Sequence, residues 1–148
     1  MKQGSVISPM LFSIYVDNLF LELKQLGLGC HVGLEYAGSF GYADDIALIC
    51  PTFYGLKKMI SVCELYALDY HITFNPLKSK LICFNIDPSV LPVIYLNGQP
   101  ISITSNDVHL GNYVSSDIYE RNIMHSICDL YQGATLLLMI FLLVIVSH

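Results

Sequence analysis

The sequence contains few charged residues. Asp, Glu, Lys and Arg make up 13% of its 148 residues, whereas hydrophobic residues make up 54%. This balance excludes general disorder and leaves a sparse charged surface for a self-contained soluble domain. The seven Lys and Arg are outnumbered by twelve Asp and Glu, and the formal net charge is -5. No overall positive field therefore attracts phosphate backbones, so nucleic-acid binding would need a local basic patch or a separate basic domain.

The sequence also lacks the usual cysteine, histidine and leader motifs. The five cysteines include no C-x-x-C pair, and the five histidines are scattered without metal-ligand spacing. The amino terminus lacks the basic-then-apolar pattern of a secretory signal. We therefore expect buried, reduced cysteines and an intracellular location, in the nucleus or the cytoplasm. No repeat or low-complexity linker interrupts the chain before its apolar end, and its length suits one core.

Two adjacent carboxylates, Asp44 and Asp45, lie between apolar, β-prone runs at 40–43 and 46–50. Such runs favour strands and Asp-Asp favours a tight turn, so this pattern predicts a β-hairpin whose two extended arms cover about 32–43 and 46–50. Like charges this close disfavour each other unless a cation or hydrogen-bond donors compensate. The pair therefore suggests a divalent-metal site. A solvated turn is the alternative that the motif by itself leaves open.

Helical periodicity predicts one helix on each side of this hairpin. Ser8 and Pro9 form a helix-start signal, and apolar residues follow at helical spacing until Gly27. Thr52 can cap a second helix, in which one apolar stripe ends at Tyr70. The members of that stripe are Leu56, Met59, Ile60, Cys63, Tyr66, Ala67 and Tyr70.

A strand is expected at 78–84, after a short extended piece and an Asn75-Pro76 turn. Lys78 and Lys80 lie close to its entry. Two lysines at a strand start are either solvated, edge-protecting charges or ligands of a phosphate, and both readings stay open.

Smaller elements follow this strand. Asn97-Gly98 predicts a type I′ hairpin, and the extended pattern at 108–114 bends at Gly111. A third helix is expected after Asp117 and Glu120, with Ile123, Ile127 and Tyr131 on its apolar side. From these patterns we divide the chain into 1–90, 91–132 and an apolar C-terminal tail at 133–148.

Residues 134–146 are almost purely apolar. As a helix at about 1.5 Å per residue they would reach roughly 20 Å, short of the roughly 30 Å hydrocarbon core of a membrane. Only the uncharged flanks at 130–147 make the length marginal, and basic anchors are absent. A membrane tail, an interface segment and a chain end unlike its parent sequence are the three alternatives.

The expected elements follow the order helix, strand, acidic turn, strand, helix, strand. One further strand before the first helix would give the split β-α-β-β-α-β layout of ferredoxin-like folds. Polymerase palms use this layout, and they need one acid on the first strand plus acids on the central hairpin to hold two metal ions. The expected fold is therefore α+β: a partial palm lacking its first strand, plus small hairpins and a C-terminal helix.

Four segments resemble motifs of the reverse transcriptases of non-LTR, LINE-type retrotransposons. In chain order they are the loop and helix start at 2–12, Tyr42-Ala43-Asp44-Asp45, the lysine motif at 74–80, and His109-Leu110-Gly111. The second resembles the catalytic hairpin of that family, and the last resembles the short hairpin that grips the primer. Order and spacing also fit, and the resemblance covers about residues 1 to 132.

The resemblance implies an RNA-directed DNA polymerase that uses two-metal nucleotidyl transfer, with Mg²⁺ or Mn²⁺, an RNA template, a DNA primer and dNTP. It assigns nine residues by position: Asp44 as a metal ligand with Asp45 as its supporting carboxylate, Tyr42 and Ala43 near the primer end, Gln3 and Gly4 at the incoming nucleotide and templating base pair, Lys78 near the triphosphate, and Leu110 and Gly111 beneath the primer strand. Gln3 as a loop polar and Leu110 as a core residue are the alternatives to these roles.

The sequence departs from the family at both ends. The first catalytic aspartate of the family lies upstream of the glutamine-glycine loop, inside which this chain starts, and the finger and thumb regions are absent. We therefore expect the isolated chain not to polymerise DNA. The alternative function is a non-catalytic nucleic-acid or protein interaction module, with a protein partner held through a sheet edge or exposed apolar surface. Membrane association through 134–146 is the third reading.

Overall fold

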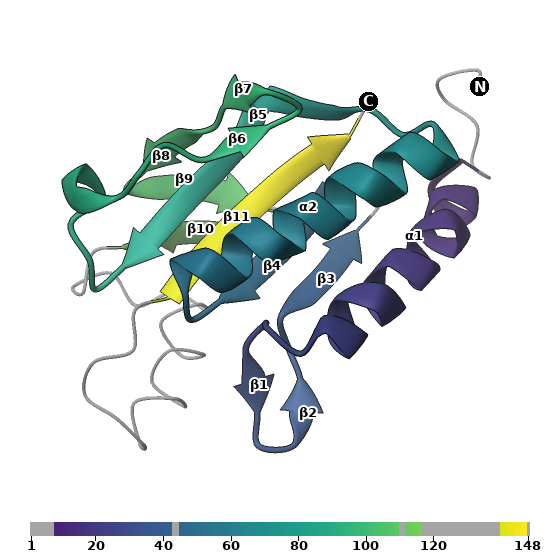
Figure 1. The fold of residues 1–148 in the computed structure, drawn as a ribbon, viewed down its shortest axis with the longest axis horizontal. Coiled ribbons are helices and arrows are strands. Elements are labelled where there is room, and N and C mark those ends of the chain that lie inside the picture. Colours follow the sequence, from purple (N-terminus) through teal and green to yellow (C-terminus); the bar gives the residue numbers. More distant parts are fainter. Residues whose placement is uncertain (1–7, 43–44, 110–111, 117–139, 148) are drawn as a thin grey trace.

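The computed structural model describes residues 8–42, 45–109, 112–116 and 140–147. Two helices, α1 (Ser8–Leu26) and α2 (Phe53–Tyr70), lie on one face of a five-stranded sheet (Figure 1). The strand order is β3-β4-β11-β5-β8. The bounds of these strands are β3 Ser39–Tyr42, β4 Asp45–Cys50, β5 Phe74–Phe84, β8 Ser102–Thr104 and β11 Ile140–Ser147. The α+β class expected from the sequence is confirmed.

Three two-stranded hairpins accompany the sheet. They are β1 (His31–Val32) with β2 (Glu35–Tyr36), β6 (Tyr95–Leu96) with β7 (Gln99–Pro100), and β9 (Asn106–His109) with β10 (Asn112–Ser115). A short 3-10 turn, η1, covers Pro88–Val90. The β6–β7 hairpin confirms the Asn-Gly prediction, because Asn97 and Gly98 have φ angles of 51° and 73°. The expected third helix lies outside the described residues.

Local capping explains where the helices begin and end. α1 begins at Ser8 and stops before Gly27, whose φ of 68° is costly for residues with a Cβ. The Thr52 hydroxyl accepts a hydrogen bond of 3.1 Å from the Gly55 N–H, so the predicted cap of α2 is confirmed. At the other end His71 takes a left-handed conformation and donates its N–H to the Ala67 carbonyl.

The apolar stripe of α2 is buried as predicted except at its last member. Leu56, Met59 and Cys63 are fully buried, whereas Tyr70 is 42% exposed. The Tyr70 ring stacks on Tyr66, with ring centroids 4.2 Å apart. Tyr70 is the final residue of the helix, so its ring covers the outside of Tyr66 instead of entering the core. Tyr70 therefore continues the apolar stripe along the helix but lies outside the core.

The extended stretch expected before the acidic turn is interrupted. The β1–β2 hairpin turns at Gly33, which has a φ of 61°, and only β3 continues into the sheet. Gly29 and Gly38 bring the two ends of this hairpin together. A Cβ on Gly38 would lie 2.4 Å from the Gly29 Cα, so neither side tolerates a side chain. The close glycine contact folds the stretch back on itself, which alternation of residues did not predict.

β5 runs through the expected Asn75-Pro76 turn as one strand of eleven residues. The Asn75-Pro76 signal corresponds to an irregularity in this strand. The register of β5 against β11 shifts between Val144 and Val146, opposite the residues that follow Asn75. The buried Ser79 hydroxyl fills this break: it donates to the Asn75 carbonyl at 2.7 Å and accepts from the Val146 N–H at 3.3 Å. Ser79 thus satisfies a β11 donor that the ladder leaves unpaired.

Replacing Ser79 with alanine is expected to lower the free energy of unfolding by about 1–2 kcal/mol, since the Val146 N–H would lose its partner. Chemical denaturation in urea measures this. The matched control is Ser61→Ala on α2, where an exposed hydroxyl donates to the Lys57 carbonyl. We expect the control to change stability by less than about 0.5 kcal/mol. Equal effects of the two substitutions would contradict a structural role for Ser79.

The C-terminal strand β11 occupies the centre of the sheet (Figure 1). It pairs antiparallel with β4 on one side and with β5 on the other, so β4 and β5 run parallel to each other. The membrane alternative treated 134–146 as a helix, whereas the part from Ile140 is a strand. Within the part of the chain that the structure describes, no helix is both long and apolar enough to cross a membrane.

The sheet separates two apolar clusters. The larger one lies between the sheet and the two helices, and alternate β11 residues from Phe141 to Ile145 enter it. The smaller one lies on the opposite face, where Cys30 and Val114 of β10 cover Leu142 and Val144. The described cysteines, Cys30, Cys50, Cys63 and Cys83, are all buried and unbridged, in agreement with the sequence-based expectation.

Candidate functional site

The acidic hairpin predicted from the sequence is present. β3 and β4 pair antiparallel, and their last pair joins Tyr42 to Asp45, the first residue of β4. Ala43 and Asp44 connect the two strands and lie outside the described residues. The described carboxylate, Asp45, is half-buried at the end of a strand whose other residues are all buried. One acid of the pair is therefore anchored by the sheet itself.

Cross-strand pairing extends this hairpin into a row of residues at one end of the sheet. Asp45 pairs with Val146 of β11, and Val146 pairs in turn with Asn75 of β5. Together with Tyr42 on β3, the row crosses four adjacent strands. Residues that pair directly in antiparallel strands share a face and have Cβ atoms about 4.5–5.5 Å apart. The carboxylate of Asp45 and the two residues beyond it are thus close neighbours.

This row faces away from the helices. Ile46, Leu48 and Cys50 belong to the cluster under the helices, whereas Ala47 and Ile49 belong to the opposite cluster. Side chains alternate along a strand, so Asp45 lies on the same face as Ala47 and Ile49. Among the described residues, the row therefore lies on the sheet face opposite α1 and α2.

The lysine motif approaches the same sheet end through the irregularity in β5. The Asn75 side-chain oxygen accepts the backbone N–H groups of Leu77 at 3.0 Å and of Lys78 at 3.3 Å. Asn75 thereby fixes the three residues that follow it. Lys78 is exposed three positions after Asn75, so the sheet register brings the acidic hairpin and Lys78 to one end of the sheet.

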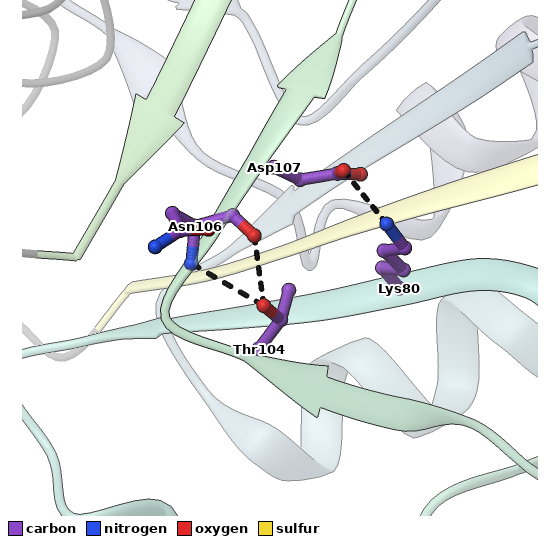
Figure 2. Close-up of polar contacts among 4 residues, drawn as sticks. All are labelled: Lys80, Thr104, Asn106 and Asp107. Carbon is purple, nitrogen blue, oxygen red and sulfur yellow. Dashed lines mark hydrogen bonds and ion pairs between the residues drawn. The ribbon is translucent and has the colours of Figure 1, made fainter.

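Lys80 has a different environment from Lys78. Its ammonium group forms an ion pair of 2.8 Å with Asp107 of β9, and the two side chains are 40% and 21% exposed (Figure 2). Thr104 shapes the chain reversal between β8 and β9: its hydroxyl donates to the Asn106 carbonyl at 2.7 Å and accepts the Asn106 N–H at 3.4 Å. This turn aims Asp107 back over the sheet toward Lys80 (Figure 2).

The ion pair and Val114 together hold the β9–β10 hairpin against the sheet face opposite α1 and α2. This is the hairpin whose connecting residues, Leu110 and Gly111, the sequence assigned to the primer strand. Those two residues lie outside the described part, as do Gln3, Gly4, Ala43 and Asp44. Of the assigned residues, the structure therefore describes Tyr42, Asp45 and Lys78, and it brings these three to the same sheet end.

The described residues do not by themselves fit the divalent cations that the resemblance implies. They contain no group of three or more His, Cys, Asp or Glu side chains that would hold a metal ion. Beside Asp45, the central strand presents Val146, whose side chain carries no oxygen. The amide oxygen of Asn75 is already occupied by two backbone N–H groups. Asp44 is outside the described residues and does not enter this test.

The sequence interpretation missed the roles of three residues in this region. They are Asn75, which accepts the backbone N–H groups of the lysine motif, Asp107, which pairs with Lys80, and Val146, which is the neighbour of Asp45. The Asn-Pro signal at 75–76 was present but was assigned to a turn. The β-branched run at 144–146 was a signal for a buried strand. Nothing in the local sequence pointed to Asp107.

Comparison with known proteins agrees with these features. The family model described as reverse transcriptase (RNA-dependent DNA polymerase) matches residues 1–121. The chain is 30% identical over 77 residues to the retrovirus-related Pol polyprotein from type-1 retrotransposable element R2 of Nasonia vitripennis, a match covering 52% of this chain and 7% of that polyprotein. It is 34% identical over 59 residues to the polyprotein from type-2 retrotransposable element R2DM of Drosophila melanogaster, covering 40% and 6%.

The matches thus span less than a tenth of either polyprotein. No solved structure matches the chain. Both relatives are Pol polyproteins of R2 elements, in agreement with the non-LTR resemblance of the four motifs. Because the family model covers most of the chain, the protein belongs to the reverse transcriptase (RNA-dependent DNA polymerase) family.

Proposed function

We propose that this chain forms the hairpin half of a reverse transcriptase palm and contacts an RNA template paired with a DNA primer. The observation that carries the proposal is the row Tyr42–Asp45–Val146–Asn75, which unites the acidic hairpin and the lysine motif at one sheet end. In this proposal the duplex lies on the sheet face opposite α1 and α2. The β9–β10 hairpin, held over that side by the Lys80–Asp107 pair, is in a position to support the primer strand.

Lys78 is the residue that we assign to phosphate. It is exposed on β5, three positions after Asn75, at the end of the sheet that carries Asp45, whereas the charge of Lys80 is engaged by Asp107. A lysine ammonium acts as a compact point charge toward phosphate oxygens of a nucleotide or of the template. Because the chain carries a net charge of -5, this contact is local and the overall affinity is weak, with a Kd on the order of 10⁻⁵ M.

The chain by itself does not complete nucleotidyl transfer in this proposal. Transfer with two Mg²⁺ or Mn²⁺ ions requires carboxylates on both sides of the reacting phosphate. β11, the strand beside Asp45, contains neither Asp nor Glu between Ile140 and Ser147. The proposal therefore separates two properties: binding of the primer–template, which the chain retains, and extension of the primer, which needs a further carboxylate.

Binding is tested by fluorescence anisotropy with a labelled RNA–DNA primer–template and the purified chain. We expect Lys78→Ala to weaken binding by about threefold to tenfold. The slope of the logarithm of the binding constant against the logarithm of salt concentration should become less steep by about one, the value for one lost phosphate contact. Lys57→Ala is the matched control, because it removes the same charge from an exposed position on α2, on the helix-covered side. Equal losses in both variants would contradict a site at Lys78.

Extension is tested with the same primer–template, all four dNTPs and Mg²⁺ or Mn²⁺. We expect no lengthened primer from the purified chain. Clear, protein-dependent extension would overturn the proposed inactivity while leaving the binding site in place.

A protein contact is the second candidate function, and the outer side of α2 favours it. Tyr54, Leu65 and Leu68 recur there at helical spacing, and Leu68 is 72% exposed. An absence of any binding to the primer–template would favour this candidate over the first.

A further inference from the structure

β4, α2 and β5 form a crossover that leaves one strand position open between its two strands. β4 and β5 run parallel, but they are not neighbours: the order around them is β4-β11-β5. The intervening position receives β11, which is antiparallel to both. In a split β-α-β arrangement, this position is filled by a strand from elsewhere in the chain.

The order of the other elements indicates which strand that would be. Apart from the small β1–β2 hairpin between α1 and β3, the order α1, β3, β4, α2 and β5 is that of the last five elements of a β-α-β-β-α-β unit. In such a unit the central position belongs to the strand that precedes the first helix. We infer that β11 takes the place of that strand in this chain, and that Val146 stands where its carboxylate would face Asp45. This inference rests on the proposed function of the acidic hairpin.

The side chains of β11 suit a central strand on both faces. Phe141, Leu143 and Ile145 enter the cluster under the helices, and Leu142 and Val144 enter the opposite cluster. All five are at most 5% exposed. A strand that is buried on both faces reads as a continuous apolar run, which is the composition of 134–146. β11 therefore supplies the packing of the sheet centre without supplying an acid.

The register identifies Val146 as the position that matters. Val146 is half-buried near the end of β11, directly opposite Asp45, with its N–H fixed by the Ser79 hydroxyl. A carboxylate placed there would have its Cβ about 4.5–5.5 Å from that of Asp45. Two carboxylates at this spacing can share a divalent or trivalent cation through oxygen ligands. An aspartate at this position would thus restore the paired-acid chemistry across the two strands.

The experiment is cation binding to the full chain, measured by Tb³⁺ luminescence and by Mn²⁺ electron paramagnetic resonance. We expect Val146→Asp to bind both ions at least about tenfold more tightly than the parent chain. The matched control is Val144→Asp, which adds the same charge on the same strand and face but lies opposite Ala47 and Lys80. The control is expected to give no such gain.

A second substitution tests whether the gain in cation affinity comes from Asp45 and the new carboxylate at position 146 acting together. Asp45→Asn in the Val146→Asp background is expected to return cation affinity to the parental level. Circular dichroism and thermal melting establish that each variant is folded. If Val146→Asp does not fold, Val146→Asn replaces it, because the neutral amide still offers an oxygen and should give a gain of about threefold.

Two results would overturn the inference. The first is a folded variant at Val146 with unchanged cation affinity, and the second is an equal gain in Val144→Asp. Neither result bears on the primer–template site, because that site is tested in the parent chain through Lys78. Failure of the inference is therefore distinguishable from failure of the proposed function.

Discussion

Replacing Leu143 with alanine is expected to lower the free energy of unfolding by about 3 kcal/mol. Leu143 is fully buried at the centre of β11, where it lies between Leu48 of β4 and Leu81 of β5. Both neighbours are themselves fully buried, so the lost methyl groups would leave a cavity that the sheet cannot close. Urea denaturation followed by circular dichroism measures the change.

Leu77→Ala provides the matched control for this substitution. Leu77 belongs to the adjacent strand β5 and carries the same side chain, but it is 81% exposed. We expect the control to alter the free energy of unfolding by less than about 0.5 kcal/mol. If Leu143→Ala also cost less than about 1 kcal/mol, the C-terminal segment would not be part of the folded core.

Elements defined by short-range signals were predicted well. The Thr52 cap, the Asn97-Gly98 turn and the glycine end of α1 each depend on residues within one helical turn or one tight turn. The strand pairing of the acidic hairpin belongs to the same class, because its two β-prone runs are contiguous in sequence, but the turn was predicted one residue too late, since Asp45 already belongs to β4 and pairs with Tyr42. For such elements the physical causes are local, and a single sequence contains them in full.

The centre of the sheet was not predicted. Residues 134–146 are almost purely apolar, and such a run has no period that separates a buried strand from a helix. The choice between them is made by β4 and β5, which lie far away in the sequence and leave one position between them. In the structure this position between β4 and β5 is taken by β11, Ile140–Ser147, more than fifty residues beyond β5 along the chain.

In the candidate site, too, local features were predicted from the sequence and long-range features were not. The residues of the hairpin and of the lysine motif were identified by type and order, but their meeting at one sheet end depends on register across three strands. The different environments of Lys78 and Lys80 likewise depend on Asp107, a residue 27 positions beyond Lys80. Sequence patterns identify candidate chemical groups, and only the long-range pairing of strands determines which of these groups share a site.

The placement of β11 can be tested chemically through cysteines that the chain already carries. Phe141 is paired with Cys50 of β4 on one side and with Cys83 of β5 on the other. Directly opposed residues have Cα atoms about 4.5–5.5 Å apart, which lies within the range for a disulfide. We therefore expect Phe141→Cys to form an intramolecular disulfide with Cys50 or Cys83 on oxidation by air with a copper catalyst.

Peptide mass spectrometry under non-reducing conditions identifies the bond. Burial raises the pKa of the Cys50 thiol, and it raises the pKa of Cys83 to about 11, so oxidation is performed at alkaline pH to increase the thiolate fraction. Leu143→Cys is the register control: it lies on the same face, but Cys50 and Cys83 are then diagonal neighbours at about 7–8 Å, too far for a bond. Equal bonding in both variants would contradict the register. A disulfide-linked dimer of Phe141→Cys would mean that the central strand comes from a second copy, because only the cis arrangement places the new thiol between the two cysteines of its own chain.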